Sequence, residues 1–189
     1  MEELKKAPVT VLLILANILV FTAVEFTGGS EDTMHMLQCG AAYTPAIMQG
    51  EYYRIFTSMF LHFGPQHLGN NMLVLFVLGG RLERTVGKLK YLLIYLLGGM
   101  GGNLLCLFLE LDSADFAVSA GASGAMIYAV IRGRGHIEDL SARQVVIMAA
   151  FSLYFGFTSE GVDNAAHVGG LICGFLLAVL LYHPSQRAG

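Results

Sequence analysis

Seven polar side chains interrupt stretches of this sequence that are otherwise apolar. Histidine, asparagine and serine exchange protons or hydrogen bonds, and each is costly among apolar surroundings unless it has a partner or a function. The seven residues are His62, His67, Asn70, Asn71, Ser123, Asn164 and His167. We therefore treat them as candidate site residues.

Ser123 and His167 could together carry nucleophilic chemistry. A serine hydroxyl is a weak nucleophile that needs a base within hydrogen-bond reach, most often a histidine. Attack on an amide produces an oxyanion, which requires convergent hydrogen-bond donors. His67, Asn71 and the backbone N–H of Ser123 could supply them. No Asp or Glu lies in these apolar stretches, which favours a Ser–His dyad over a three-member triad.

The composition indicates that these residues lie in a membrane protein. Of 189 residues, 55% are hydrophobic and only 13% are charged, whereas soluble domains contain about 25% charged residues. The mean hydropathy is +0.62. A net charge of -3 offers no basic surface for nucleic acid. Three cysteines are too few for a multi-bridge disulfide framework.

The apolar stretches predict an all-α polytopic bundle in one domain that covers residues 1–189. A helix needs about 20 residues to cross the hydrocarbon core. The predicted spans are residues 7–26, 65–82, 89–110, 116–131, 143–158 and 164–182. A long outer loop, residues 25–62, separates the first two and carries enough apolar side chains to pack on the bundle or dip into the outer leaflet. The short fourth span predicts a helix start below the surface, beside a water-filled cavity.

The distribution of charge predicts the orientation. Six spans place both termini and two connections on one side, and that side holds ten of the eleven Lys and Arg residues. Arg54 is the exception. The positive-inside rule therefore predicts that both termini are cytoplasmic. In this topology His67, Asn71, Ser123 and His167 lie at similar depths, near the outer face, on three different helices.

Small residues offer a competing interpretation of the same segments. Gly121 and Ala125, and likewise Gly170 and Gly174, form small-xxx-small patterns that let membrane helices approach each other closely. A serine at position 123 could serve that packing alone. The coincidence of two histidines, an asparagine and a glycine-flanked serine at one depth favours a site.

Three motifs resemble those of the rhomboid family of intramembrane serine proteases. Gly121-Ala122-Ser123-Gly124-Ala125 looks like its GxSGA motif, and Ala166-His167-Val168-Gly169-Gly170, followed by Gly174, resembles its AHxxGxxxG motif. The segment from His62 to Asn71 is similar to its HxxxxHxxxN motif. Tyr53-Arg54 stands where the family commonly has Trp-Arg. The resemblance extends from Ala7 to Tyr182 and is to the minimal six-helix bacterial form.

The resemblance implies a role for each matching residue. Ser123 matches the nucleophile and His167 the general base, while His67 and Asn71 match side chains of the oxyanion hole. Structural or motif roles fall to His62, Gly121, Gly124, Gly170, Gly174 and Arg54. One departure concerns position 127, which is Ile here; members often carry an aromatic residue four positions after the nucleophile, and here the aromatic residue is Tyr128.

These observations predict an intramembrane serine endopeptidase that needs no cofactor and no metal. Its partners would be transmembrane protein substrates and the lipid bilayer, with no nucleic acid and no obligate protein partner. Its location would be the bacterial plasma membrane, with the active site opening to the outer face.

Three other functions remain open from the sequence. A catalytically inactive relative would bind transmembrane helices without cleaving them, although such proteins usually lack the serine or the histidine. His62, His67 and His167 could instead bind zinc, but no HExxH-type pairing accompanies them. A transporter would require intramembrane acids or inverted repeats, which we do not find. Inactivation by a fluorophosphonate but not by a chelator would separate a serine protease from a zinc site.

Overall fold

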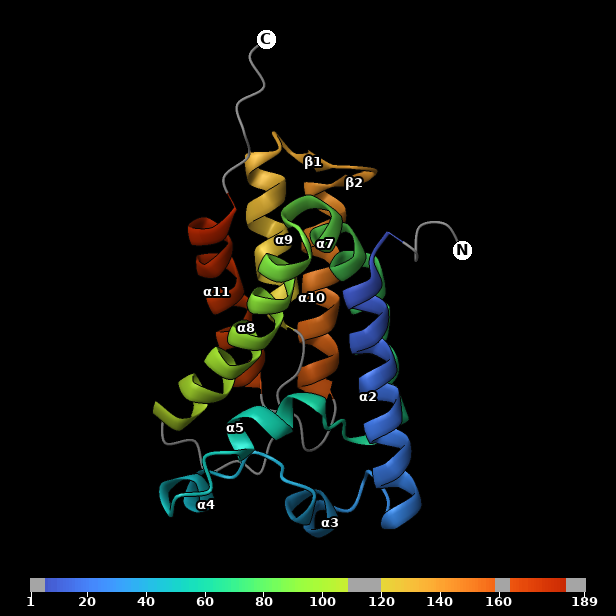
Figure 1. Cartoon of the computed structure of the whole chain (residues 1–189), viewed down its shortest axis with the longest axis vertical. Coiled ribbons are helices and arrows are strands. Elements are labelled where there is room, and N and C mark those ends of the chain that lie inside the picture. Colours follow the sequence, from blue (N-terminus) through green and yellow to red (C-terminus); the bar gives the residue numbers. More distant parts are fainter. Residues whose placement is uncertain (1–5, 109–119, 159–163, 183–189) are drawn as a thin grey trace.

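The computed structural model describes residues 6–108, 120–158 and 164–182. In these ranges the chain forms a helical bundle with one small hairpin (Figure 1). The elements are α2 (Pro8–Thr27), α3 (Thr33–Gln38), α4 (Thr44–Met48), α5 (Arg54–Thr57), the 3-10 turn η1 (Ser58–Phe60), α6 (Gly64–Val74), the π-helical turn η2 (Leu75–Gly79), α7 (Gly80–Val86), α8 (Lys88–Phe108), α9 (Ala120–Arg132), β1 (His136–Ile137), β2 (Leu140–Ser141), α10 (Ala142–Thr158) and α11 (Asn164–Leu181).

The sequence predicts a single span over residues 65–82, and the structure divides this region into three parts. α6, η2 and α7 follow one another without a break from Gly64 to Val86. Pro65 fits the first turn of α6, where its missing N–H costs nothing. The π-helical turn lies in the middle, and such turns occur mostly as single bulges within α-helices. Apolar periodicity alone does not reveal a bulge of this kind.

Among the described residues, α2 is the helix that is long and apolar enough to cross a membrane. It has 20 residues and a mean hydropathy of 2.3. The apolar segments Ala142–Tyr154 and Ala166–Leu181 are shorter. The side chains of Leu12, Leu19 and Phe26 on α2 are exposed, which suits contact with lipid better than contact with water.

Close contacts between helix backbones hold α8, α9 and α11 together. A Cβ atom at Gly124 of α9 would collide with the carbonyl group of Leu171 on α11 and lie 2.9 Å from the nitrogen of Phe175. A Cβ atom at Gly102 of α8 would collide with the carbonyl oxygen of Ala166. Only glycine allows these distances, as the small-xxx-small patterns suggest.

Buried hydrogen bonds fasten α2 to the helices beside it. The carboxylate of Glu83 in α7 accepts hydrogen bonds from the backbone nitrogens of Val9 and Thr10 and from the Thr10 hydroxyl, at 2.8–3.0 Å. This carboxylate therefore satisfies free N–H groups at the start of α2. Further along α2, the Asn17 amide donates to the Tyr95 hydroxyl of α8 at 3.1 Å.

The predicted outer loop, residues 25–62, contains ordered short helices. The guanidinium of Arg54 donates to the carbonyl oxygens of Leu37 and Ala41, at 2.7 and 2.9 Å, and to the carboxylate of Glu51. The amide of Asn103 in α8 donates to Ser58 Oγ and to the carbonyl of Ile55, each at 2.8 Å. The segment is thus tied both to itself and to the bundle. We refer to residues 28–63 as the outer cap.

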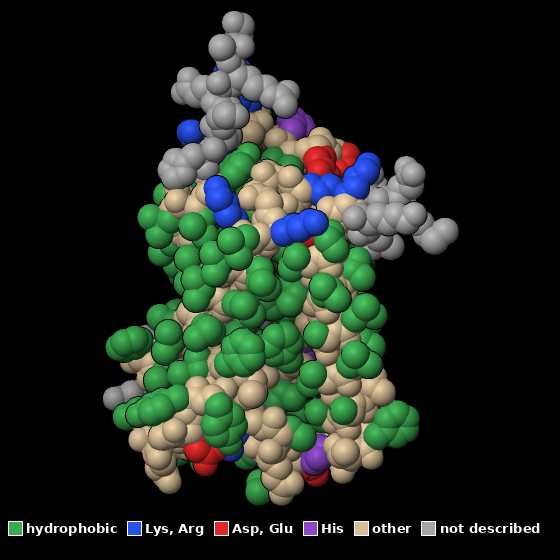
Figure 2. Space-filling model, viewed as in Figure 1, with side chains coloured by type: hydrophobic (Ala, Val, Ile, Leu, Met, Phe, Trp, Pro, Cys, Tyr) green, Lys and Arg blue, Asp and Glu red, His purple; other side chains and the backbone are tan. Residues whose placement is uncertain are grey.

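The two ends of the bundle differ in their side chains. The start of α2, α7, the β1–β2 hairpin and the end of α11 share one end, and α3, α4 and α5 lie at the other (Figure 1). On the face shown in Figure 2, Lys and Arg side chains gather at the first of these ends, above a broad apolar middle region.

Candidate active site

Ser123 lies near the start of α9, next to Gly124, which contacts α11. The side chain is only 1% exposed, and its Oγ has no hydrogen-bond partner among the described residues. A buried hydroxyl without a partner is unfavourable, and each such group requires an explanation. Catalytic duty is one explanation, because a nucleophile must stay available for substrate.

His167 lies at a matching position near the start of α11 and is also 1% exposed. The contact between Gly124 and Leu171 fixes how α9 and α11 pack. That contact lies one residue after Ser123 and one helical turn after His167. The absence of a side chain at position 124 therefore lets α9 and α11, the helices that carry Ser123 and His167, approach each other closely.

His67 in α6 lies beside His167 of α11. Its ring centroid lies 5.9 Å from that of His167. The backbone N–H of Phe63 donates to Nδ1 of His67 at 3.3 Å. Since Nδ1 accepts, a neutral His67 carries its proton on Nε2. That Nε2 is buried and has no partner among the described residues, so a hydrogen-bond donor is available at this position.

Two further members of the predicted group are buried beside His67. Asn71 is one helical turn farther along α6 and is 2% exposed. His62 precedes α6, and its ring centroid lies 5.3 Å from that of His67. The three histidine rings thus form a row in which His67 is central. The position of His62 on the far side of the His67 contact suits a supporting role.

The departure from the family pattern at Ile127 has a structural counterpart. Tyr128 packs edge-on against Phe175 of α11, with ring centroids 5.4 Å apart and planes at 80°. Its ring is therefore engaged by Phe175, and Ile127 packs against the hydrophobic core. In this chain the imidazole that lies beside His167 is that of His67.

The other predicted residues lie outside this group or serve its packing. Arg54 belongs to the outer cap. Gly124, Gly170 and Gly174 are buried, and a Cβ atom at Gly102 would lie 3.1 Å from the nitrogen of Gly170. Gly121 belongs to the backbone of α9, and the structure does not describe its burial. The start of the predicted fourth span, residues 116–119, is also outside the described residues.

The site is closed in this structure. The sequence predicts an outward-opening cavity at Ser123, but both Ser123 and His167 are only 1% exposed. A separate groove of about 150 Å³ lies between α6 and α10. It is lined by Asn70, Leu73, Val74, Ile147, Met148, Phe151 and Ser152. The sequence pattern singles out Asn70 in this set. It does not single out the lining residues of α10, because they resemble those of any apolar membrane helix.

The zinc alternative lacks a suitable donor set. Within the part of the chain that the structure describes, no group of three or more His, Cys, Asp or Glu side chains is arranged to hold a metal ion. Cys39 and Cys173 are free thiols.

The fold and the site define a class of protein, a helical bundle that buries a serine and three histidines in an apolar interior. Comparison with known proteins then gives the family. The Rhomboid domain family model matches residues 49–184. The chain belongs to the rhomboid family and is an integral membrane protein.

Individual relatives agree with this assignment. The chain is 35% identical to the rhomboid protease GluP of Bacillus subtilis over 185 residues, which cover 97% of the chain and 36% of GluP. It is 32% identical to the rhomboid protease AarA of Providencia stuartii, over 90% of the chain and 71% of AarA. It is 36% identical to the mitochondrial RHOMBOID-like protein 6 of Arabidopsis thaliana, over 85% of the chain and 53% of that relative. The chain thus spans about a third of GluP and about half of the Arabidopsis relative.

Proposed function

We propose that this protein is an intramembrane serine endopeptidase that cleaves transmembrane segments of other proteins with a Ser123–His167 dyad. The observation that carries the proposal is the contact between the rings of His67 on α6 and His167 on α11. The buried hydroxyl of Ser123 on α9 and Nε2 of His67, which have no partner among the described residues, support it. Two relatives of the chain are named rhomboid proteases, which supports the reaction class.

The reaction follows from the chemistry of these groups. His167 accepts the proton of Ser123 Oγ as the oxygen attacks the scissile carbonyl carbon. The negative charge that develops on the carbonyl oxygen is stabilised by the Nε2–H of His67, the side-chain amide of Asn71 and the backbone N–H of Ser123. His167 then gives the proton to the leaving amine, and water hydrolyses the acyl-enzyme in the reverse sense.

A dyad without an acidic third residue suits an apolar interior. A carboxylate that oriented His167 would have to be buried in a membrane at a high desolvation cost. Packing can hold the imidazole instead, and the ring of His67 lies next to it. This arrangement explains how a dyad could serve where soluble proteases use a third, acidic residue.

We propose the topology and location that the charges predict. Residues 1–189 form one domain with six spans, and the outer cap lies outside. Both termini are cytoplasmic, in a bacterial plasma membrane. Support comes from the Lys and Arg side chains, which gather at the end that carries α7 and the hairpin (Figure 2), and from the rule that cytoplasmic connections are rich in these residues.

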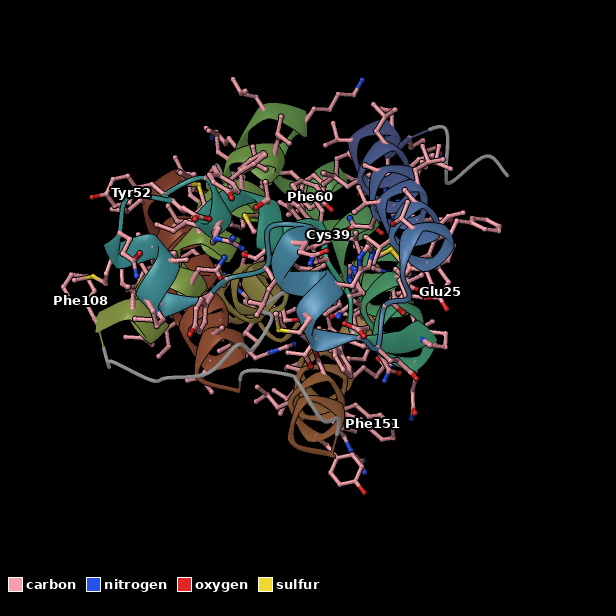
Figure 3. The ribbon with its side chains drawn as sticks, turned by 90° about the horizontal axis from the view of Figure 1, so that it is seen from below. Glu25, Cys39, Tyr52, Phe60, Phe108 and Phe151 are labelled. Atoms are coloured by element: carbon pink, nitrogen blue, oxygen red, sulfur yellow. The ribbon has the colours of Figure 1, made fainter. Side chains whose placement is uncertain are left out.

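Substrates would reach the buried serine sideways from lipid, through the groove between α6 and α10. The groove has an apolar lining with Asn70 at its α6 edge, and Asn70 is adjacent in sequence to the proposed oxyanion donor Asn71. Figure 3 looks at the end that carries the outer cap, and Phe151 lies at the periphery of that view, away from Cys39 at its centre. A substrate helix would unwind locally on passing this point, since helical peptide bonds are protected.

The second candidate function is that of an inactive relative that binds transmembrane helices. The closed site and Ile127 are the observations that favour it. Ser123→Ala distinguishes the two, because only a hydroxyl is lost where space is tight. We expect the purified variant in proteoliposomes to lose cleavage of a labelled single-span substrate, while Ser30→Ala, which alters an equally buried serine of the outer cap, retains it. Cleavage at the wild-type rate by Ser123→Ala would exclude the proposed nucleophile.

A further inference from the structure

The helix that forms one wall of the groove is weakly embedded. In the part of α10 from Ala142 to Tyr154, the side chains of Val145 and Ala149 are buried, one helical turn apart. Val146, Ile147, Phe151 and Tyr154 are exposed. Ala142 and Met148 add partly buried contacts with the core, but a helix with this many exposed side chains gains less hydrophobic stabilisation than a fully buried one. The placement of α10 must therefore depend strongly on how its ends are held.

One end of α10 is held by a pair of two-pronged ion pairs. The tip of the β1–β2 hairpin, which leads directly into α10, carries Glu138 and Asp139. Arg84 of α7 binds the Glu138 carboxylate through two nitrogens, at 2.8 and 2.6 Å, and Arg81 binds Asp139 in the same way, at 2.8 Å for both contacts. Such two-pronged contacts fix direction as well as distance.

The connection from this clamp to α10 is short and stiff. The backbone N–H of Ser141 donates to the side-chain oxygen of Gln144 at 2.9 Å, and the backbone N–H of Gln144 donates to the Ser141 hydroxyl oxygen at 3.4 Å. This reciprocal arrangement is a capping box that starts the helix. Glu138 adopts a left-handed conformation, with φ of 51°, which a non-glycine residue keeps only where its surroundings hold it. Movement of the hairpin tip would therefore move the start of α10.

The other side of the clamp reaches the helix that carries His67 and Asn71. Arg81 also donates to the carbonyl oxygen of Val77 at 2.9 Å. Val77 lies in η2, where the π-helical turn changes the ordinary backbone hydrogen-bond pattern. A single guanidinium thus joins the middle of the α6–η2–α7 helix to the hairpin that begins α10.

We propose that Arg81 and Arg84 are positioning residues that set the width of the groove between α6 and α10. They hold the cytoplasmic end of α10 as a pivot, so that its outer half alone can separate from α6. This inference rests on the proposed function, in which the groove admits substrate. From Ala142 to Thr158 the helix is about 24 Å long, so a tilt of about 10° at the pivot would move its outer end by roughly 4 Å.

The clamp is partly exposed, so its ion pairs can shift position. A cavity of about 380 Å³ adjoins it, lined by Ala7, Thr10, Phe76, Gly80 and the four charged residues of the clamp. The side chains of Arg81 and Arg84 are 21% and 18% exposed. Pairs in such surroundings are weaker than buried ones and hold a preferred position without locking it.

The test measures the groove directly, without reference to cleavage. Spin labels are placed at Leu73 of α6 and Tyr154 of α10, both exposed, in the full chain in proteoliposomes, with and without Ser123→Ala. We expect Arg84→Glu to broaden the distance distribution and to shift it outward by roughly 3–5 Å, the movement that the pivot geometry gives. The charge swap Arg84→Glu with Glu138→Arg should restore the wild-type distribution. A reference pair at Leu93 and Ile172, on α8 and α11, should not change.

Milder variants guard against misfolding. Glu138→Gln and Asp139→Asn alter side chains that are 37% and 70% exposed, and together they should produce the same widening. Arg132→Gln, an exposed arginine at the same end of the molecule, is the matched control and should not. An unchanged Leu73–Tyr154 distribution in all of the clamp variants would overturn the proposal.

Cleavage provides the second measurement. We compare the cleavage rates of a substrate with helix-weakening residues and a substrate with a stable helix. We expect the ratio of these two rates to be at least about threefold lower in the clamp variants than in the wild-type protein. The charge swap should restore the wild-type ratio. Widening of the groove in a chain that never cleaves would support the clamp while refuting the proposed function. If the clamp variants cleave with the wild-type rate ratio and keep the wild-type Leu73–Tyr154 distance, the role of the clamp is refuted and the proposed function stands.

Discussion

At the scale of single residues, the hydrogen bond from Phe63 to His67 has the most direct chemical consequence. It uses Nδ1 as acceptor, so Nε2 of the neutral ring carries the proton and can donate. An uncharged donor that is already oriented suits an apolar site, because it stabilises a developing oxyanion without the cost of burying a cation. Asn71, one turn away, offers a second donor of the same kind.

The oxyanion assignment leads to a graded effect of mutation. Loss of one oxyanion donor typically lowers turnover by about 10²–10³. We expect His67→Ala and Asn71→Ala to cleave more slowly by this order and to remain less impaired than His167→Ala, measured as initial rates on one substrate in proteoliposomes. Equal and unimpaired turnover in both variants would leave Ser123 with backbone donors alone.

A matched control separates chemistry from stability. Asn17 is another fully buried asparagine, and its amide joins α2 to Tyr95 of α8. Asn17→Ala should lower the thermal unfolding temperature because it removes a buried hydrogen bond, yet lower turnover far less than Asn71→Ala. The reverse pattern would indicate that Asn71 has a structural role.

The sequence identifies the candidate residues but not their contacts. Each one is a polar residue in an apolar stretch, which is visible without a structure. The row of three histidine rings and the engagement of Tyr128 by Phe175 depend on helix packing, which joins residues as far apart in sequence as His67 and His167. Glu83 illustrates the limit: its neighbours in sequence include Arg81 and Arg84, and nothing there indicates that it is buried against α2.

At the scale of elements, the approach of α9 to α11 depends on Gly124. A Cβ atom at this position would overlap the carbonyl group of Leu171. We expect Gly124→Ala to destabilise the protein by about 1–3 kcal/mol, because overpacking forces the backbones apart, and to reduce cleavage by separating the helices that carry Ser123 and His167. Thermal unfolding in detergent measures the first effect.

Gly69 in α6 provides the control for this prediction. No atom lies within 4 Å of a Cβ atom placed there. Gly69→Ala should therefore be neutral or should stabilise the helix by about 0.5–1 kcal/mol, since alanine loses less conformational freedom than glycine. Equal destabilisation by both substitutions would contradict the role given to the α9–α11 contact.

The hairpin clamp predicts a dependence on pH. Hydrogen bonding to Arg81 lowers the pKa of Asp139 to about 2 from an ordinary value near 3.8. A lowered pKa in the folded state means that this pair stabilises the fold above about pH 4 and that the contribution disappears as the pH falls toward 2. Asp139→Asn should lower the unfolding temperature at pH 6 and by much less at pH 2. A difference that is the same at both pH values would show that the ion pair is not responsible.

The sequence predicts the long helices better than it predicts the π-helical turn and the short helices of the outer cap. Long apolar runs predict an all-helical membrane protein, and the helical structure and the family assignment agree with that prediction. The π-helical turn at Leu75–Gly79 and the short helices of the outer cap were not predicted. The turn depends on contacts such as that of Arg81 with Val77, and the cap depends on Arg54, which binds carbonyl groups 13 and 17 positions away.

At the scale of the whole molecule, the motifs predict the family, whereas the distribution of charge predicts the orientation in the membrane. Three motifs in the expected order predict the rhomboid family, and the family comparison confirms it. The orientation in the membrane rests on the Lys and Arg bias and stays a prediction. The burial of Ser123 and His167 adds a requirement to the proposed function that the sequence does not reveal: water and substrate would have to enter by movement of the bundle.

Cysteine labelling tests the orientation. Cys39 in the outer cap is half-buried, burial raises the pKa of its thiol, and its sulfur lies 3.5 Å from Nε2 of His35. In intact cells we expect slow labelling of Cys39 by a membrane-impermeant maleimide and fast labelling of Met48→Cys, which replaces a side chain that is 71% exposed. Labelling of both sites only after permeabilisation would reverse the proposed topology.

The central claim is that Ser123 is a nucleophile activated by His167, and a fluorophosphonate tests it most directly. The reagent bonds covalently to an activated serine oxygen, and mass spectrometry of the labelled protein in detergent locates the adduct. We predict a stoichiometric adduct on Ser123 that is unaffected by chelator, is absent from Ser123→Ala, and forms at least about 100-fold more slowly in His167→Ala. An unmodified Ser123 in the wild-type protein, or an adduct that forms equally fast without His167, would contradict the account.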